Sequence, residues 1–324
     1  MELNLKINKQ RLAPFVFISP FFILLLIFGI FPVGFNIFLS FTRWNGMALS
    51  NIRFMGLTNY KFLLSNRDPY FWKTVGITGW LLLFGSLTQH IFAIPLAILL
   101  NNKLLRGRNI FRTAYFMPYI TSTVSISIIF TMFYAYEAGM FNWILGIFNI
   151  PPLDWLQSRE TLPLAVAILI NWKYIGWNTI IYLAGLQSIP SELYESAEID
   201  GAPLFTKHVH ITIPMLAPII FFAVTISIIG GMQLFIEPFV LTRGYDQMGG
   251  GGNSVFTVAF YIMWLLQRGA RLGKGAAVSW LLFIIVVIMT FFNRYITDLL
   301  EGKRVLKKRK EIKASDVQIA EDYE

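Results

Sequence analysis

The sequence predicts an all-α integral membrane protein with about six transmembrane helices. The chain has 324 residues, of which 56% are hydrophobic and 14% are charged, whereas a soluble globular chain carries about 25% charged residues. Its apolar residues gather in six long stretches, each with the roughly 20 residues that a spanning helix needs. The chain contains no cysteine, which excludes disulfides, thiolate nucleophiles and cysteine metal sites.

The first predicted span is overlong and contains Pro14, Pro20 and Pro32, which spanning helices tolerate because neighbouring groups satisfy the freed backbone. No convincing small-residue cleavage site follows it, so it is predicted to be an anchor and not a removed signal. Two shorter apolar runs, 139–150 and 255–267, are predicted to be interfacial or re-entrant helices. The six predicted spans are Ala13–Thr42, Thr74–Leu100, Thr113–Tyr136, Leu162–Leu186, Pro214–Leu234 and Gly275–Tyr295.

The distribution of lysine and arginine predicts that both termini are cytoplasmic. In this orientation the basic residues of the short loop 102–112 and of the C-terminal tail lie on the cytoplasmic side, as the positive-inside rule requires. The basic run 303–310 is interpreted as a stop beside anionic membrane lipid, in preference to a nucleic-acid site. The segment 188–214, between the fourth and fifth spans, then faces the cytoplasm.

The polar segment 188–214 is predicted to form two short helices joined by a tight turn. Ser191 is predicted to cap the first helix, and three glutamates recur at intervals of three residues near one face of it. Gly201 follows the predicted end of that helix, where a left-handed residue is common. Pro203 suits the first turn of the second helix, and Pro214 is predicted to begin the fifth span.

This segment contains no recognisable catalytic or metal centre. His208 and His210 are two residues apart, a spacing that does not place two ligands on one helix face. The nearest approach to a phosphate-binding loop, residues 269–275, lacks the glycine spacing and the serine or threonine of that motif. The chain is therefore predicted to be no enzyme, and segment 188–214 is predicted to be a docking surface for a soluble partner.

The same segment resembles the EAA signature, E-A-A-x3-G-x9-I-x-L-P, which marks permease subunits of ATP-binding-cassette (ABC) importers. Ser196 and Ile213 stand in place of the usual alanine and leucine. The flanking stretches 111–120 and 172–202 are similar to sugar-importer permeases of the maltose-transporter type, in their F-like group. The resemblance covers about residues 10–300. The matching positions are Glu195, Ser196, Ala197, Gly201, Ile211 and Pro214.

The resemblance implies the MetI-like fold of a type I importer permease in the bacterial cytoplasmic (inner) membrane. It implies that segment 188–214 is a coupling helix, with Glu195 as the charged contact, Gly201 as the tight turn, and Asp200 and Ala202 beside it. The implied partners are a second permease subunit in a heterodimer, an ABC ATPase dimer, an extracytoplasmic solute-binding protein, a sugar substrate and membrane lipid, with no nucleic acid. No cofactor is expected on this chain, because ATP and Mg²⁺ would bind the partner ATPase.

The fourth span contains an ionisable residue, Lys173, which costs about 2.5–3.5 kcal/mol at the centre of a membrane on insertion scales. Aromatic and amide side chains surround it in the sequence, and such groups stack on sugar rings and bond their hydroxyls. The alternatives are a pair between Lys173 and an acid of the partner subunit, or snorkelling towards the interface. For Gln233 and Glu237, near the outer end of the fifth span, the alternative is a capping or loop contact. The predicted pathway residues are Asn171, Lys173, Tyr174, Trp177, Asn178, Gln233 and Glu237.

The predicted organisation has four segments. They are a cytoplasmic N-terminus at 1–12, the first span with its outer loop at 13–73, a permease core at 74–296 that includes the coupling loop 188–214, and a charged cytoplasmic tail at 297–324. The predicted function is import of a sugar or oligosaccharide by alternating access. The alternatives are the same machinery with a polyol, a glycerol phosphate or an anionic oligosaccharide, and more remotely a membrane-bound transferase or an ion channel.

Overall fold

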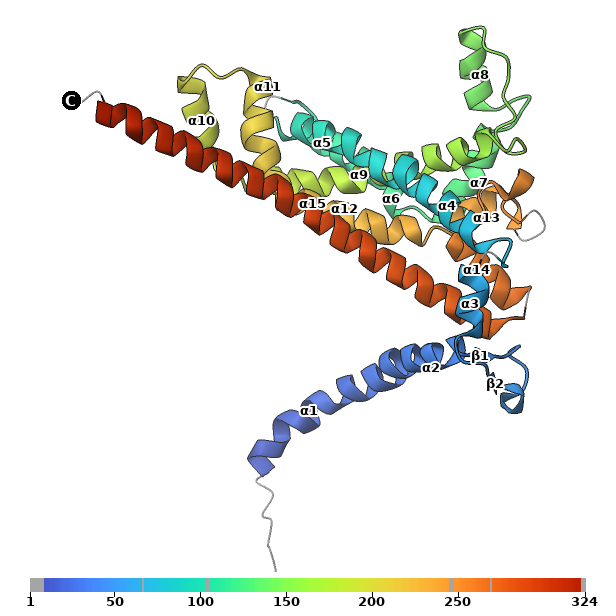
Figure 1. Ribbon diagram of the computed structural model, residues 1–324. Coiled ribbons are helices and arrows are strands. Elements are labelled where there is room, and N and C mark those ends of the chain that lie inside the picture. The colour runs from blue at the N-terminus through green and yellow to red at the C-terminus, as the bar shows by residue number, and fades with distance from the viewer. Residues whose placement is uncertain (1–8, 66, 103–104, 245–247, 269, 322–324) are drawn as a thin grey trace, which may run out of the picture. The chain divides into compact units, whose positions relative to one another are not determined.

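The computed structural model describes residues 9–65, 67–102, 105–244, 248–268 and 270–321, with side chains between residues 14 and 298 of these ranges. The described chain is almost entirely helical, and its two short strands pair antiparallel (Figure 1). The strands are β1 (Thr42–Arg43) and β2 (Arg53–Phe54). The helices are α1 (Lys9–Leu25), α2 (Phe31–Ser40), α3 (Thr58–Leu64), α4 (Phe71–Leu81), α5 (Thr88–Asn101), α6 (Arg108–Ile120), α7 (Thr123–Phe133), α8 (Met140–Ile147), α9 (Thr161–Gln187), α10 (Glu192–Ile199), α11 (Leu204–Lys207), α12 (Ile213–Met232), α13 (Ile236–Leu241), α14 (Val258–Gln267) and α15 (Leu272–Glu321).

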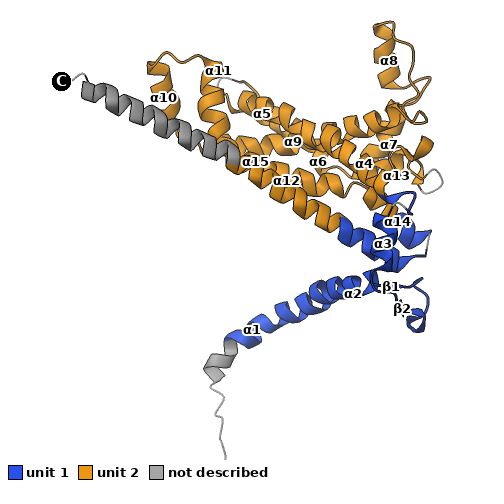
Figure 2. Cartoon of the chain, in the orientation of Figure 1, with its two compact units in different colours: residues 1–71, 262–281 blue, residues 72–261, 282–324 orange. Residues whose placement is uncertain are grey.

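Contacts divide the chain into two compact units (Figure 2). Unit 1 comprises residues 1–71 and 262–281, and it includes the first span and the β1–β2 pair. Unit 2 comprises residues 72–261 and 282–324, and it includes α5 to α13. The four segments predicted from the sequence are divided by their position across the membrane, which the two units do not test. That division stays a prediction.

Five helical stretches in the described part of the chain are long and apolar enough to cross a membrane. Within three of these stretches a π-helical turn joins two consecutive α-helices. The turns are Leu26–Ile30, Leu82–Leu87 and His208–Thr212. A sixth span exists if the bent pair α6–α7 crosses as one unit. The multi-span helical class is therefore confirmed. The five stretches are Pro14–Ser40, Phe71–Asn101, Thr161–Gln187, Leu204–Met232 and Leu272–Asp298.

The predicted third span at 113–136 is not one straight helix, because α6 and α7 meet at an angle of 98°; the pair is a broken span or a re-entrant loop. The backbone is extended at Thr121 (ψ 145°) and Ser122 (ψ 126°), between the two helices. Pro118 lies in the last turn of α6 and has no N–H to extend the hydrogen-bond ladder. Helix α6 instead packs along α9. Helices α6 and α7 therefore run in different directions on either side of residues 121–122.

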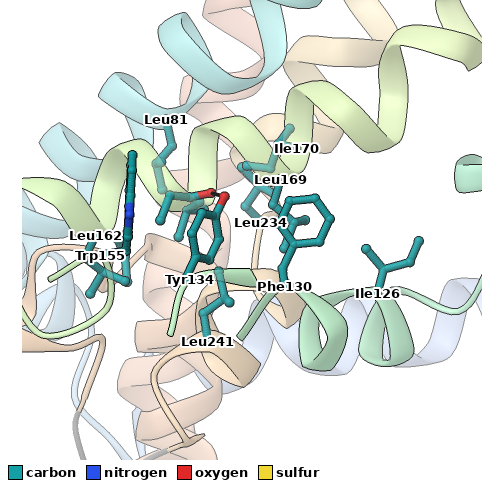
Figure 3. Packing of buried hydrophobic residues seen from close by; sticks show 13 residues of the cluster. Leu81, Ile126, Phe130, Tyr134, Trp155, Leu162, Leu169, Ile170, Leu234 and Leu241 are labelled. Carbon is teal, nitrogen blue, oxygen red and sulfur yellow. Dashed lines mark hydrogen bonds between the residues drawn. The ribbon is translucent and has the colours of Figure 1, made fainter. Parts of the chain in front are cut away.

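Helix α9 is the centre of unit 2, where it packs against α5, α6, α12 and α13. A buried cluster surrounds its N-terminal half (Figure 3). Tyr134 lies between Phe130 and Trp155 in this cluster, and its hydroxyl donates to the carbonyl oxygen of Ala165 at 2.8 Å. In Figure 1, α10 and α11 lie at one end of α9 and α7, α8 and α13 lie at the other.

The two-helix prediction for 188–214 is confirmed at its turn and wrong at both ends. Ser191 has helical backbone angles and makes no side-chain capping bond, so it is not a cap. Gly201 has φ +70°, and the Ala202 N–H donates to the Ala197 carbonyl at 2.9 Å, which closes the helix with a left-handed residue. The helical stretch that contains the fifth span begins at Leu204, ten residues before the predicted start of the span.

Pro214 lies inside that span and does not begin it. A proline ring clashes with the carbonyl four residues earlier and has no N–H to donate. The turn His208–Thr212 is π-helical, and the Ile213 N–H donates to the carbonyl of His208, five residues back. The wider turn accommodates the proline without breaking the helix.

The two short apolar runs form α8 and α14, which are too short to span. Their lengths agree with the prediction of interfacial or re-entrant helices.

Candidate functional site

The first candidate site is the exposed surface of α10 and the turn that follows it. Glu195, Ser196 and Asp200 are all exposed. Gly201 is exposed as well, and a side chain there would meet no other atom within 4 Å. The turn therefore needs glycine for its positive φ and not for space.

Two contacts fix α10 to the helix that enters the membrane. Lys207, whose side chain is 8% exposed, forms an ion pair with Glu198 at 2.8 Å. The hydroxyls of Tyr194 and Thr212 are joined by a hydrogen bond of 2.8 Å. The sequence prediction placed Glu198 with the other glutamates and missed both contacts, because each partner lies 9 to 18 residues away.

Three apolar side chains beside the turn are also exposed, and they too were missed. Ile199 is 87% exposed, Phe205 79% and Leu204 71%. Large apolar residues at the surface of a polar segment indicate a protein interface. The available signal was their position directly on either side of the glycine turn.

The remaining signature residues lie at the base of this surface. Ala197 and Ala202 are half-buried and share the hydrogen bond that closes the turn. Ile211 and Pro214 are half-buried in the π-helical turn and the start of α12. These four residues shape the segment, whereas Glu195, Ser196 and Asp200 face outwards.

The second candidate site surrounds Lys173 in the middle of α9. Lys173 is 3% exposed, so it does not snorkel along the span. Its ammonium group donates to the hydroxyl of Thr123, the first residue of α7, and lies 5.1 Å from the centre of the Tyr174 ring. Thr123 directly follows the bend between α6 and α7, and the predicted span 113–136 did not include that bend.

Tyr174 connects Lys173 to the buried carboxylate of Glu237. The Tyr174 hydroxyl donates to Glu237 Oε1 at 3.4 Å, and Glu237 is 4% exposed. Lys173 and Glu237 are therefore ionisable groups of opposite sign that both contact Tyr174. Buried ionisable groups need hydrogen-bond partners. In this cluster Thr123 and Tyr174 supply them.

An aromatic stack lies beside the charged groups. The rings of Trp177 and Tyr119 are parallel to within 17°, with centroids 4.3 Å apart. Phe116 stacks on the same indole at 6.2 Å, and Tyr119 contacts Tyr174 edge-on at 6.0 Å. Phe116 and Tyr119 were not predicted, although their spacing of three residues on one helix face was a readable signal.

The other predicted pathway residues have different surroundings. The Asn171 amide donates to the carbonyls of Phe84 and Ala167, both at 2.9 Å, which ties α9 to a neighbouring helix. Asn178 is 2% exposed and donates to the carbonyl of Tyr174 at 3.3 Å. Gln233 is exposed at the end of α12, while Glu237 is on α13, so the two do not share one helix face.

Comparison with known proteins supplies the family. Residues 93–303 match the model of the family described as "binding-protein-dependent transport system inner membrane component". The chain is 34% identical to the arabinooligosaccharides transport system permease protein AraP of Bacillus subtilis, over 91% of both chains. It is 34% identical to the lactose transport system permease protein LacF of Rhizobium radiobacter, over 86% of this chain and 92% of that one.

A third relative is the trehalose/maltose transport system permease protein MalF of Thermococcus litoralis, which is 32% identical over 89% of this chain and 94% of that one. Two solved structures of a bacterial alginate ABC transporter share the fold. One has a TM-score of 0.75 at 22% identity, over 91% of this chain and 97% of that one. The other has a TM-score of 0.72 at 21% identity, over 90% of this chain and 96% of that one.

The resemblance first seen in the EAA segment thus extends over most of the chain. Because the family consists of transport system components, its match argues against the alternatives of a membrane-bound transferase and an ion channel. The chain belongs to the family of binding-protein-dependent transport system inner membrane components, multi-pass proteins of the inner membrane.

Proposed function

We propose that this chain is the permease subunit of an ABC importer that moves a sugar or oligosaccharide across the inner membrane. The observation that carries the proposal is the agreement of the three relatives, whose names state arabinooligosaccharide, lactose and trehalose/maltose transport and which match this chain over most of its length. Transport proceeds by alternating access, with ATP hydrolysis on a separate subunit.

The substrate contacts are proposed at Lys173, Tyr174, Trp177 and Glu237. The stacked rings of Trp177 and Tyr119 offer an aromatic face, and the charged and hydroxyl groups beside it bond sugar hydroxyls. Because the cluster contains one cation and one anion, it favours a neutral saccharide over an anionic oligosaccharide or a glycerol phosphate. The hydrogen bonds of Asn171 and Asn178 support a role for these two residues in holding α9 in place. Gln233 is exposed, so a solute in the pathway could contact it.

The coupling surface is proposed to dock on the ATPase subunit. Glu195 and Asp200 supply charge, Ser196 lies between them on the exposed face, and the apolar side chains beside Gly201 supply contact area. The contacts Glu198–Lys207 and Tyr194–Thr212 support transmission of a rigid-body shift from α10 into the fifth span.

The complete transporter is proposed to contain a second permease subunit, an ABC ATPase dimer that binds ATP and Mg²⁺, and an extracytoplasmic binding protein that delivers the sugar. One of the solved neighbours is in complex with a periplasmic protein bound to an alginate pentasaccharide, which supports the last of these partners. Both termini of this chain are proposed to be cytoplasmic.

The substrate class is tested by uptake into proteoliposomes that contain the complete transporter and its binding protein. We expect ATP-dependent uptake of a neutral radiolabelled di- or oligosaccharide. Uptake of a polyol, glycerol 3-phosphate or an anionic oligosaccharide alone would contradict the proposed substrate class while leaving the transport family unchanged.

A further inference from the structure

Unit 1 contains a cavity of about 820 Å³ that the transport mechanism above does not use. Its walls come from the loop that follows the first span and from the residues that precede and begin α15. Basic and aromatic side chains line it, among them Arg43, Arg53, Arg271, Lys274, Trp44 and Phe62. The cavity is thus basic and carries two aromatic side chains.

The positive charge of this cavity is not neutralised within unit 1. Asp68 is the only acidic residue in the ranges 9–71 and 262–281. Its buried carboxylate forms an ion pair with Lys274 and accepts the backbone N–H groups of Tyr70 and Phe71 at 2.9 and 2.8 Å. Apart from Asp68, the described ranges of unit 1 contain no carboxylate that could pair with the three arginines lining the cavity.

Two of these arginines are also held opposite each other. Arg43 of β1 and Arg53 of β2 are direct partners in the antiparallel pair. Like charges directly opposite across a strand pair are destabilising. An anion between or beside the two guanidinium groups would remove that repulsion.

The cavity walls are fixed by contacts on several sides. The Asn59 amide donates to the carbonyls of Ser40 and Thr42, both at 2.9 Å. The Leu272 N–H donates to the Trp44 carbonyl at 3.0 Å, which joins the loop to the start of α15. The Trp44 ring N–H donates to the Ala48 carbonyl at 3.0 Å. The arginines therefore project from a backbone that is ordered before any ligand binds, which lowers the entropy cost of binding.

The cavity lies beside the ends of the first and last spans, which is the depth at which lipid headgroups lie. Arg43 is three residues after Ser40, the end of the first span, and Arg271 directly precedes Leu272, the start of the last one. At about 1.5 Å per helical residue these positions lie within a few ångströms of the hydrocarbon boundary. Tryptophan is enriched at this depth.

The same loop also carries exposed apolar residues, which suit contact with the acyl chains of a lipid. Met47 is 82% exposed, Leu49 71% and Phe54 71%. A soluble anion would need no apolar rim beside its site, whereas a phospholipid presents both a charged headgroup and hydrocarbon.

From these observations we propose that the cavity lined by Arg43, Arg53 and Arg271 binds the phosphate of an anionic phospholipid, on the membrane face that the charge distribution predicts to be the outer one. The planar guanidinium group bonds phosphate oxygens in pairs. Trp44 lies at the headgroup level, and Met47, Leu49 and Phe54 contact the acyl chains.

The test uses the complete transporter complex in lipid nanodiscs made of equal amounts of phosphatidylglycerol and phosphatidylcholine. Native mass spectrometry counts the phosphatidylglycerol retained on this subunit. The variant Arg43→Gln/Arg53→Gln removes two charges from the cavity, and Lys61→Gln/Arg67→Gln removes two from exposed positions of the same loop that do not line it. The variant Arg43→Lys/Arg53→Lys keeps the charge and removes the paired donors.

We expect the glutamine variant of the cavity to weaken phosphatidylglycerol binding by about 30-fold, the effect of two basic residues near an anionic membrane surface. The lysine variant retains more lipid than the glutamine variant, and the Lys61/Arg67 control binds as the wild type does. Equal retention in the cavity variant and the control would overturn the proposal. Displacement of the lipid by millimolar inorganic phosphate would identify the site as one for a soluble anion and also overturn it. A cavity variant that keeps its lipid but loses stimulation of ATPase activity by the binding protein would assign the surface to that protein instead.

Discussion

Single residues in the middle of unit 2 are placed by contacts between helices. Lys173 reaches Thr123, Tyr174 reaches Glu237, and Trp177 stacks on Tyr119, although the members of the first two pairs are 50 and 63 residues apart in the sequence. Each side chain gains a partner only because α6, α7, α9 and α13 meet at this point. The consequence is that changes to single residues here act on a shared cluster.

The substitution Lys173→Met is predicted to lower sugar uptake by about tenfold or more, because it removes the buried ammonium group that donates to Thr123 and lies over the Tyr174 ring. Lys173→Arg keeps the charge and should retain part of the uptake. Uptake by the reconstituted transporter is the measurement, with the amount of assembled complex as the control. Unchanged uptake in both variants would remove Lys173 from the pathway.

Gly176 is predicted to be essential for the packing of α6 on α9. A methyl group on this residue would collide with the backbone carbonyl of Tyr115. Gly176→Ala should therefore lower the free energy of unfolding by about 1–3 kcal/mol. Gly230→Ala is the matched control, because a methyl group there meets no atom within 4 Å and alanine favours a helix. Thermal unfolding of the two variants in detergent measures the difference, and equal midpoints would contradict this account of the packing of α6 on α9.

At the scale of elements, α10 and the fifth span behave as one connected piece. The closing hydrogen bond of the turn, the ion pair Glu198–Lys207 and the bond Tyr194–Thr212 join them. The π-helical turn at His208–Thr212 then carries the helix past Pro214 without a break. A displacement of α10 is therefore expected to reach α12.

The variants Glu195→Ala and Gly201→Pro are predicted to reduce ATPase activity stimulated by substrate and binding protein. The first removes an exposed charge of the docking surface, and the second cannot adopt φ +70° because proline fixes φ near −65°. The control is Glu192→Ala, a glutamate exposed on the same helix. The coupling proposal fails if the stimulated activity of the assembled complex persists in both variants.

At the scale of the whole molecule, the proposed orientation of the chain in the membrane is tested with introduced cysteines. The chain contains no cysteine, so any introduced cysteine is the only thiol of this subunit. Ser196 lies on the predicted cytoplasmic surface, and Ser65 lies in the predicted outer loop; both are exposed.

We expect a membrane-impermeant maleimide, added to intact spheroplasts, to label Ser65→Cys and to label Ser196→Cys only after the membrane is opened. The reverse pattern would invert the proposed orientation of every loop. It would also place the cavity lined by Arg43, Arg53 and Arg271 at the cytoplasmic leaflet.

The sequence by itself determined the membrane class, the positions of five spans to within about ten residues at each end, and the glycine turn of segment 188–214. These features depend on local properties: the length of an apolar run, or the positive φ that Gly201 adopts without strain. The EAA positions were readable for the same reason, since they lie within one short segment.

Only the tertiary structure decided the bend at residues 121–122, the passage of a helix through Pro214, and the cluster around Lys173. Apolar residues at 113–136 are compatible with either a straight span or two helices at an angle. In the structure α6 packs closely on α9 at Gly176, and α7 runs at 98° to α6. The cluster depends on contacts between residues tens of positions apart, such as Lys173 with Thr123. Hydrophobicity along the chain indicates which residues leave water, but it does not say which of them meet, because that is set by the packing of helices against one another.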